Sequence, residues 1–388
     1  MIPYGRQDIT AEDVAAVTRV LQSDFLTQGE EVPRFEAAVA AYCGVAHGVA
    51  VNSATSALHI ACLALDLGPG DWLWTSPITF VASANCARYC GAGVDFVDID
   101  PLTFNMSVEA LRAKLIQAKQ AGRLPKIVVP VHMAGQSCDM VGIHALAKEY
   151  GFRIIEDASH AIGGRYGHEP VGSCRYSDIT VFSFHPVKII TTAEGGLAVT
   201  NHPELARRMA LLRSHGITRD PAEMTHTSEG AWYYQQVGLG FNYRMTELQA
   251  ALGSSQMNRL DAYVAQRHAL ANAYDDMLRD LPLQTPYRAA GRYSAFHLYI
   301  VNLTGPAAQQ RQAVFDALRT RGIGVNVHYI PVHTQPYYQQ LGLEVGYSPS
   351  SFPCANAYYA TALSLPLYAT MSQAQQHQVL RALQEVLS

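Results

Sequence analysis

The sequence predicts an α/β fold, in which a large domain with a mainly parallel sheet precedes a smaller α+β domain. Over the first two thirds of the chain, short apolar runs alternate with segments of helical periodicity. Strands separated by helices need crossover connections, which produce parallel sheets covered on both faces. After Asn242 this alternation ends and helical spacing takes over. A chain of 388 residues is also too long for one small core, so two domains are expected.

The large domain is expected to alternate strands and helices from residue 48 onward. Apolar runs predict strands at residues 48–51, 72–75, 94–99, 127–131, 153–155, 179–184 and 197–200. Helical periodicity predicts helices at 56–62, 81–89 and 141–150. Binding sites in such folds collect at the carboxyl ends of the strands, so polar residues that end or follow a strand are the candidates for a site.

The last third of the chain predicts a different arrangement. Apolar residues keep helical spacing from 245 to 278, which predicts one or two helices leading out of the large domain. A strand at 296–303, a helix at 309–321 and a strand at 323–329 are expected next. Ser372 and Gln375 form the pattern of a capping box that opens a final helix. We place the domain boundary near residue 255, which gives a large domain of 1–255 and a small domain of 256–388.

The composition excludes several classes of protein. Hydrophobic residues make up 49% of the chain and charged residues 15%, as in an ordinary soluble globular protein. The net charge is −4 and basic clusters are absent, which disfavours nucleic-acid binding. The N-terminus lacks the pattern of a signal peptide, and the sequence contains no long apolar stretch that predicts a membrane span.

The cysteines indicate a reducing compartment. Seven are scattered along the chain, an odd number that suits reduced core thiols in the cytoplasm. Cys86 and Cys90 share a predicted helix face, but no His or third Cys stands nearby, so we expect no metal site.

Lys188 is the most informative single residue. The other four lysines, Lys114, Lys119, Lys126 and Lys148, fall in polar helical or pre-strand contexts, where an ammonium can stay in water. Lys188 stands in apolar surroundings, where an ammonium loses hydration, its pKa falls and the amine becomes a nucleophile for Schiff-base chemistry. The alternative is a lysine whose stem lies on apolar surface while its head reaches solvent. The local sequence supports both interpretations equally.

Three further segments have the chemistry of a pyridoxal phosphate (PLP) site. At residues 52–58, small residues and the hydroxyls of Thr55 and Ser56 open a helix, whose N-terminus attracts phosphate. A plain N-cap is the simpler interpretation of that segment alone. Asp157 ends an apolar strand, where it is placed either to hold a pyridine nitrogen protonated or to cap a neighbouring helix. Glu156 should point to the other side of the strand. Ser183 ends the strand before Lys188, where its hydroxyl can help hold a phosphate.

In this order, these segments resemble fold-type I PLP enzymes, and within them the DegT/DnrJ-type nucleotide-sugar aminotransferases. The resemblance covers nearly the whole chain. It rests on residues 25–29, 52–58, 77–85, 130–136, 155–161, 183–196, 240–249 and 322–331. Residues 2–7, 183–188 and 326–329 carry a finer likeness to the 4-aminotransferases of pseudaminic acid biosynthesis.

The resemblance implies roles for individual residues. Lys188 is similar to the Schiff-base lysine, Asp157 to the partner of the ring nitrogen and Phe80 to the residue stacked on the ring. Thr55, Ser56 and Ser183 match phosphate-binding positions, and Asn242 matches a residue donated to the neighbouring subunit's cofactor phosphate. Ala54 and His160 stand where many members have Gly and Gln, and both are expected beside the cofactor. The positions expected to contact the nucleotide sugar, some of them shared with the cofactor, are Tyr4, Asp24, Phe25, Leu26, Thr27, Ala54, Ser183, Asn242, Arg244, Asn326, Val327, His328 and Tyr329.

The resemblance also implies a reaction. It is the transfer of an amino group from L-glutamate to C4 of a UDP-linked 4-keto-6-deoxy-N-acetylamino sugar, in a cytoplasmic homodimer that shares its active sites and needs no metal. The alternatives are an aminotransferase for a dTDP-linked or 3-keto sugar, a PLP-dependent sugar dehydratase, and a non-catalytic sensor that binds sugar or PLP. A dehydratase of this type carries His in place of the lysine, which this chain keeps, and no DNA-binding segment supports a sensor. An NAD-dependent enzyme is disfavoured because residues 52–58 lack the spaced glycines of a dinucleotide fingerprint.

Overall fold

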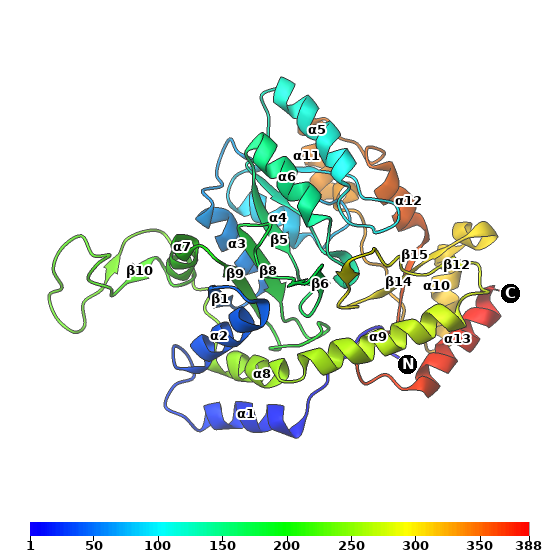
Figure 1. The fold of residues 1–388 in the computed structure, drawn as a ribbon, viewed down its shortest axis with the longest axis horizontal. Coiled ribbons are helices and arrows are strands. Elements are labelled where there is room, and N and C mark those ends of the chain that lie inside the picture. The colour runs from blue at the N-terminus through cyan, green and yellow to red at the C-terminus, as the bar shows by residue number, and fades with distance from the viewer. Residues whose placement is uncertain (388) are drawn as a thin grey trace.

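A computed structural model describes residues 1–387 of the chain. Within these residues the largest sheet has seven strands (Figure 1). In spatial order they are β1 (His47–Val51), β9 (Gly196–Thr200), β8 (Ile179–Ser183), β5 (Arg153–Asp157), β4 (Ile127–Val129), β2 (Trp72–Thr75) and β3 (Gly93–Phe96). Neighbours from β8 to β3 pair in parallel, and β9 alone runs antiparallel to both of its neighbours. The predicted fold class is therefore confirmed.

Both faces of this sheet are covered, because successive strand residues point to opposite sides. On one face, Ile155 and Val181 pack in a core with α3 (Ala54–Ala64), α4 (Ala82–Tyr89) and α7 (Pro203–Arg213). On the other, Ile154 packs with α5 (Val108–Gln120) and α6 (Met140–Tyr150), and Phe182 with α2 (Glu31–Cys43). The strand ends between these layers are thus held rigidly.

Two helices lead out of the sheet region, as the spacing predicts. α8 (Glu247–Met257) packs on α2 and on α1 (Ala11–Leu21), and α9 (Leu260–Met277) continues from α8 toward the right of Figure 1. A second core follows, around an antiparallel sheet of β12 (Leu283–Gln284), β14 (Tyr299–Leu303) and β15 (Ala362–Leu365), with α10 (Arg311–Thr320) and α13 (Gln373–Leu387). Ser372 and Gln375 exchange the predicted capping bonds before α13. The domain boundary near residue 255 stays a prediction.

The predicted strand at 323–329 is wrong. These residues make only two isolated bridges, Ile323 with Ile2 and Asn326 with Ser364. The physical reason is that two distant segments share its backbone groups. The Gly324 amide donates to the Ile2 carbonyl of the N-terminal arm, whereas Asn326 exchanges backbone bonds with Ser364 of β15. The following residues are left free to turn toward the ends of β5 and β8.

The remaining elements are short. They are β6 (Arg165–Tyr166), β7 (Glu169–Pro170), β10 (Ile217–Thr218), β11 (Gln235–Gln236), β13 (Arg292–Tyr293), α11 (Pro336–Val345), α12 (Pro353–Thr361) and three 3₁₀ turns (Met133–Gly135, Gly305–Gln309 and Val332–Thr334). The segment that contains β10 and β11 projects from the body as an arm (Figure 1). Along residues 1–387, no helix combines the length and apolar character that a membrane crossing requires.

Two expectations about single residues are corrected. Lys114 does not stay in water, because its ammonium bonds Asp95 at 2.8 Å and lies over the Trp74 ring, 5.1 Å from its centroid. Burial lowers the pKa of Lys114, against the opposing effect of Asp95. Cys90 does have other ligand-type residues nearby, since Cys62 and His59 from α3 lower the pKa of its thiol to about 6. Within the described part of the chain, no group of three or more such side chains is arranged to hold a metal ion.

Candidate active site

A cavity of about 940 Å³ lies where β5 and β8 end. Its walls include Asn52 after β1 and Val131 after β4, so it occupies the carboxyl edge of the sheet, where sites of this fold class collect. Most of the predicted site residues line it, namely Tyr4, Ala54, Thr55, Ser56, Phe80, Asp157, His160, Ser183, Lys188, Asn326, Val327, His328 and Tyr329.

Lys188 is held in the connection between β8 and β9. The buried side chains of Phe184 and Ile189 anchor this connection, and the Lys188 amide donates to the His185 carbonyl at 2.9 Å. The lysine side chain is half-buried in the cavity wall. Burial lowers the pKa of Lys188 to about 8, although Asp157 opposes the shift. The amine is therefore far more often unprotonated near neutral pH than an exposed lysine would be.

Asp157 and Glu156 point to opposite sides of β5. Asp157 Oδ2 accepts a hydrogen bond from Ser83 at 2.6 Å, and Oδ1 accepts one from the Ser159 amide at 3.1 Å. Glu156 instead bonds His132 Nε2 at 2.6 Å, behind the cavity. The alternation along the strand thus directs only Asp157 toward the cavity.

The N-terminus of α3 forms the end of the cavity nearest β9. Ser53, rather than Thr55 or Ser56, is the N-cap, and it accepts from the Ser56 amide at 3.1 Å. Gly196 brings β9 against this turn, because a Cβ at position 196 would lie 2.6 Å from Ala54 Cα. The turn therefore presents free backbone N–H groups in a tight cradle suited to an anion.

Three histidines surround the lysine side of the cavity. His160 Nε2 lies 3.0 Å from the Tyr329 hydroxyl, and the His160 and His297 rings are 4.4 Å apart. Burial and the charge of Lys188 lower the pKa of His328 to about 3, and burial is also the main reason that the pKa values of His160 and His297 fall well below the ordinary range. All three rings are therefore neutral, and Nδ1 of both His160 and His297 is buried without a hydrogen-bond partner.

Six predicted site residues lie elsewhere. Asp24, Phe25, Leu26 and Thr27 are exposed between α1 and α2. Asn242 is exposed and pairs with Ser214 through the backbone, while Arg244 pairs with Val51. None of the six lines the cavity of its own chain, among the residues the structure describes.

Sequence reasoning also missed several lining residues. They are Asn52, Ser53, Thr79, Ser159, His185, Glu194, Gln249 and His297. Most lie within quoted segments but had no individual signal, since serine, threonine and glutamine occur at many turns and caps. His297 falls within the predicted strand at 296–303, where nothing in the sequence marks it as a site residue, and only the folded chain brings it to His160.

The donor set fits PLP. The cavity offers an amine of lowered pKa, a carboxylate held by two donors, and a helix N-terminus with the Ser183 hydroxyl for a phosphate. His160 adds a neutral imidazole to the same wall. An aldehyde with a pyridine ring and a phosphate would satisfy all of them.

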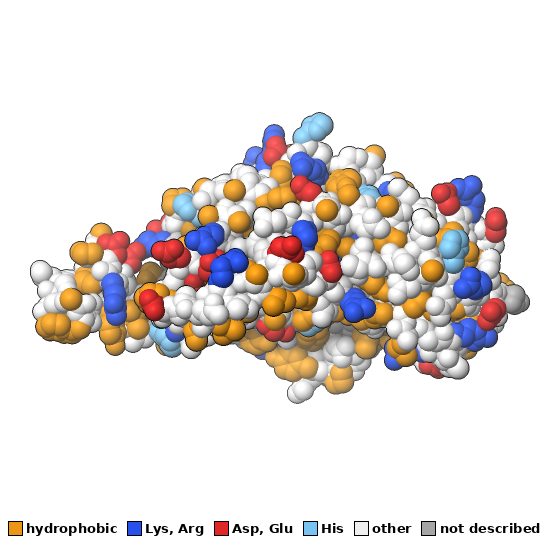
Figure 2. Space-filling view, turned by 90° about the horizontal axis from the view of Figure 1, so that it is seen from below, with side chains coloured by type: hydrophobic (Ala, Val, Ile, Leu, Met, Phe, Trp, Pro, Cys, Tyr) orange, Lys and Arg blue, Asp and Glu red, His pale blue; other side chains and the backbone are white. Residues whose placement is uncertain are grey.

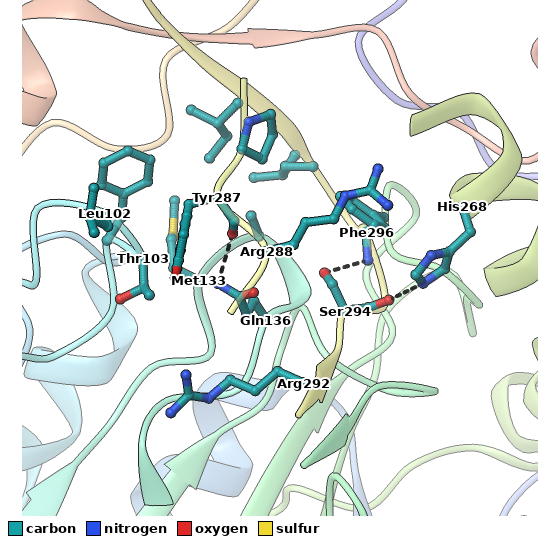
Figure 3. Close-up of a pocket in the computed structure, with 15 residues that line it drawn as sticks. Leu102, Thr103, Met133, Gln136, His268, Tyr287, Arg288, Arg292, Ser294 and Phe296 are labelled. Carbon is teal, nitrogen blue, oxygen red and sulfur yellow. Dashed lines mark hydrogen bonds between the residues drawn. The ribbon is translucent and has the colours of Figure 1, made fainter. Parts of the chain in front are cut away.

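A second, separate pocket does not compete for this role. It lies between β14 and the turn at residues 102–104, and its volume is about 50 Å³ (Figure 3). Two of its polar side chains are already paired, through the bonds from Gln136 to the Tyr287 carbonyl and from His268 to the Ser294 carbonyl. Ligand pockets typically measure about 300–1,000 Å³, so this one is too small for a sugar nucleotide.

Comparison with known proteins identifies the family of this chain. The sequence profile of the DegT/DnrJ/EryC1/StrS aminotransferase family matches residues 7–384. The spore coat polysaccharide biosynthesis protein SpsC of Bacillus subtilis (strain 168) is 39% identical over 389 residues, covering 100% of this chain and 97% of the relative. The UDP-4-amino-4,6-dideoxy-N-acetyl-beta-L-altrosamine transaminase of Campylobacter jejuni (strain NCTC 11168) is 37% identical over 373 residues, which cover 96% of this chain and 94% of the relative.

Solved structures are similar over the same length. PseC of Helicobacter pylori, an aminotransferase involved in the biosynthesis of pseudoaminic acid, superposes with a TM-score of 0.90 at 31% identity, covering 100% of this chain and 99% of PseC. The PLP form of Spr1654 from Streptococcus pneumoniae superposes with a TM-score of 0.88 at 27% identity, covering 100% of both chains. The chain therefore belongs to the DegT/DnrJ/EryC1/StrS family of PLP-dependent sugar aminotransferases.

Proposed function

We propose that this sugar aminotransferase moves the amino group of L-glutamate to C4 of a UDP-linked 4-keto-6-deoxy-N-acetylamino sugar. The observation that carries the sugar assignment is the 37% identity, over 96% of the chain, to an enzyme named as a transaminase of such a UDP-linked sugar. The size of the cavity supports it, since about 940 Å³ accommodates a nucleotide sugar beside a cofactor.

Lys188 is the proposed catalytic base and acid. When bound, PLP supplies an electron sink for the negative charge that develops at the reacting carbon. Nζ of Lys188 takes the proton from Cα of the amino donor, and in the second half-reaction it gives a proton to C4 of the sugar. A pKa of about 8 suits both directions, because neither protonation state dominates strongly near neutral pH.

The other cavity residues bind and orient. The Asp157 carboxylate holds a proton on the ring nitrogen, and Phe80 packs on the ring. Ala54, Thr55, Ser56 and Ser183 hold the phosphate at the N-terminus of α3. His160, whose Nε2 atom lies 3.0 Å from the Tyr329 hydroxyl, would lie beside the ring.

The sugar is proposed to lie between the N-terminal arm and residues 326–329. The Tyr4 and His328 rings are 5.2 Å apart, so the two segments meet at the cavity that Lys188 lines. The Tyr329 ring lies 6.1 Å from the ring of Phe80, which lines the same cavity. Asn326 and Val327 complete this wall. Neutral histidines and tyrosines recognise hydroxyl and amide groups by hydrogen bonds, which suits an N-acetylamino sugar.

A second subunit is proposed to complete the site. Lys188 is the sole Lys or Arg among the described residues that line the cavity, although a diphosphate and the carboxylates of glutamate call for cations. Arg244 and Asn242 lie outside the cavity, near the base of the β10–β11 arm. The arm exposes Trp232 and Tyr234, and Figure 2 shows apolar side chains at its tip, on the left. We assign Asn242 and Arg244, together with Asp24–Thr27 and the β10–β11 arm, to the site of the partner in a homodimer.

Substrate profiling tests the proposal. The purified enzyme, PLP and L-glutamate are incubated with UDP-linked 4-keto, dTDP-linked 4-keto and 3-keto sugars, and 2-oxoglutarate and the aminated sugar are measured. Amination of the UDP-linked 4-keto sugar, absent in Lys188→Ala, is expected. Preference for a dTDP-linked or 3-keto sugar would refute the sugar assignment and leave the family assignment intact.

A further inference from the structure

The carboxylate of Asp157 is the end of a buried chain of hydroxyl groups. Ser83, in α4, lies 2.6 Å from Asp157 Oδ2, and Thr79, in the turn before α4, lies 2.7 Å from Ser83. The three side chains are no more than 5% exposed. They come from two segments far apart in the sequence, which the packing of α4 on the sheet brings together.

The Asp157 carboxylate fixes the direction of the hydrogen bonds between these groups. An ionised carboxylate only accepts hydrogen bonds, so the Ser83 hydroxyl must donate to Asp157. The Ser83 oxygen is then free to accept, and the Thr79 hydroxyl donates to it. Consecutive donors polarise one another, so the bond from Ser83 to Asp157 is stronger than an isolated one.

This chain of hydroxyl groups also fixes the rotamer of Asp157. Ser83 holds Oδ2 and the Ser159 amide holds Oδ1, so the carboxyl plane cannot rotate without breaking one of two bonds. Both Thr79 and Asp157 line the cavity, while Ser83 lies behind them. The carboxylate is thereby directed at the cavity before any ligand enters.

We propose that Ser83 is a positioning residue that aims Asp157 at the ring nitrogen of PLP, and that Thr79 supports it by donating to its oxygen. This inference rests on the proposed role of Asp157 in the aminotransferase site. Loss of either hydroxyl lets the carboxylate turn away, and the ring nitrogen then holds its proton less tightly. Misplacement of a positioned group by about 1 Å can cost up to roughly a hundredfold in rate.

The test compares Ser83→Ala, Thr79→Val and Thr79→Ser with the wild type. Thr75→Val is the matched control, because its buried hydroxyl also makes one bond, 2.8 Å to the Val129 carbonyl, but not to Asp157. Each variant is loaded with PLP, and the visible absorbance of the bound cofactor is titrated against pH. The rate of the half-reaction with L-glutamate is measured in a single turnover.

The visible absorbance changes when the protonated nitrogen that joins Lys188 to the cofactor loses its proton. A weaker positive charge on the ring makes that nitrogen harder to deprotonate, so the midpoint of the absorbance titration should move to higher pH. We expect this shift in Ser83→Ala, a smaller one in Thr79→Val, and wild-type behaviour in Thr79→Ser and Thr75→Val. The half-reaction should slow by roughly tenfold or more in Ser83→Ala. Should Ser83→Ala fail to fold, the pair of Thr79 variants decides the question.

Wild-type midpoints in both Ser83→Ala and Thr79→Val would overturn the inference, as would an equal shift in Thr75→Val. The absorbance titration needs only PLP. A failure of the sugar assignment, which appears as missing sugar amination in the wild type, is therefore distinguished from a failure of this inference.

Discussion

Gly196 and Ala54 lie so close that any side chain at position 196 would meet the turn that opens α3. A Cβ there would be 2.6 Å from Ala54 Cα, which is closer than real Cβ atoms approach. The glycine thus lets the first residues of β9 support the backbone that we assign to the cofactor phosphate.

Gly196→Ala should therefore weaken PLP binding and destabilise the chain. Overpacking of a closed site typically costs about 1–3 kcal/mol, here with displacement of the α3 turn. PLP affinity by absorbance titration and urea unfolding are the measurements. Gly68→Ala is the control, because a Cβ at Gly68 meets nothing within 4 Å. Unchanged PLP affinity in Gly196→Ala would contradict the phosphate assignment.

The pH dependence of cofactor attachment should report the lowered pKa of Lys188. Only the unprotonated amine attacks an aldehyde, so the rate at which apoenzyme captures PLP should rise about tenfold per pH unit and level off above a pH of about 8. Stopped-flow absorbance from pH 6 to 10.5 measures the profile, after correction for the ionisation of free PLP. A rate that still climbs tenfold per unit at pH 9 and 10 would show an ordinary, solvated lysine.

The buried pair behind the cavity should contribute to stability. Burial alone would raise the pKa of Glu156, but the bonds from His132, Ser177 and Thr180 prevail and hold that pKa below its usual value. A carboxyl group with a lowered pKa in the folded state stabilises the fold above its unfolded pKa of about 4.5, and this contribution is lost as pH falls below that value. Glu156→Ala should cost about 3–5 kcal/mol at neutral pH, because it leaves buried donors unpaired.

Urea unfolding of the wild type and Glu156→Ala, at pH 7 and at pH 4, checks this prediction. The difference between the two proteins should shrink at pH 4. Arg112→Ala is a suitable control, since Arg112 pairs with Glu149 at the surface and should contribute little at either pH. A pH-independent difference would mean that the ionised carboxylate does not contribute.

Subunit mixing should reveal a shared active site. If Asn242 acts in the partner's site, a heterodimer of Lys188→Ala with Asn242→Asp contains one site with both native residues. Its activity should be about half that of the wild-type dimer, whereas each parent homodimer is inactive. The heterodimer is isolated by co-expression with two different affinity tags.

A heterodimer of Lys188→Ala with Asp157→Asn provides the matched control. Both residues line the cavity of one chain, so neither site of that heterodimer is complete and activity should stay lost. Recovery in the control, or its absence in the Asn242 heterodimer, would contradict the assignment of residues to the two subunits.

Much of the fold was predictable because it depends on local apolar runs. Trp72–Thr75 is a strand in the prediction and in the structure, since a buried parallel strand must be apolar on both faces. The error at 323–329 could not be seen in the sequence, because two distant segments, the N-terminal arm and β15, share the hydrogen-bonding groups of these residues. The prediction that the Lys114 ammonium stays in water was wrong for a similar reason, since a helical lysine gives no sign that Asp95 and Trp74 will lie beside it.

The residues of the candidate site also divide into those that the sequence could predict and those that it could not. Residues at strand ends, such as Asp157 and Ser183, carry a sequence signal because the sheet itself fixes their position. Ser83 carried none, because its hydroxyl gains a role only when α4 packs beside β5. Likewise, a contribution from a second subunit leaves no signal in one chain, so the proposed role of Asn242 rests on the family resemblance and on its exposure.

The central claim is that Lys188 is the amine that binds the cofactor covalently. Borohydride reduction of the PLP-loaded enzyme, followed by proteolysis and peptide mass analysis, tests it most directly. The account predicts a phosphopyridoxyl group on Lys188, and no label in Lys188→Ala or after incubation with excess L-glutamate. A label confined to another lysine, such as Lys114, or tight PLP binding without any covalent label, would contradict it.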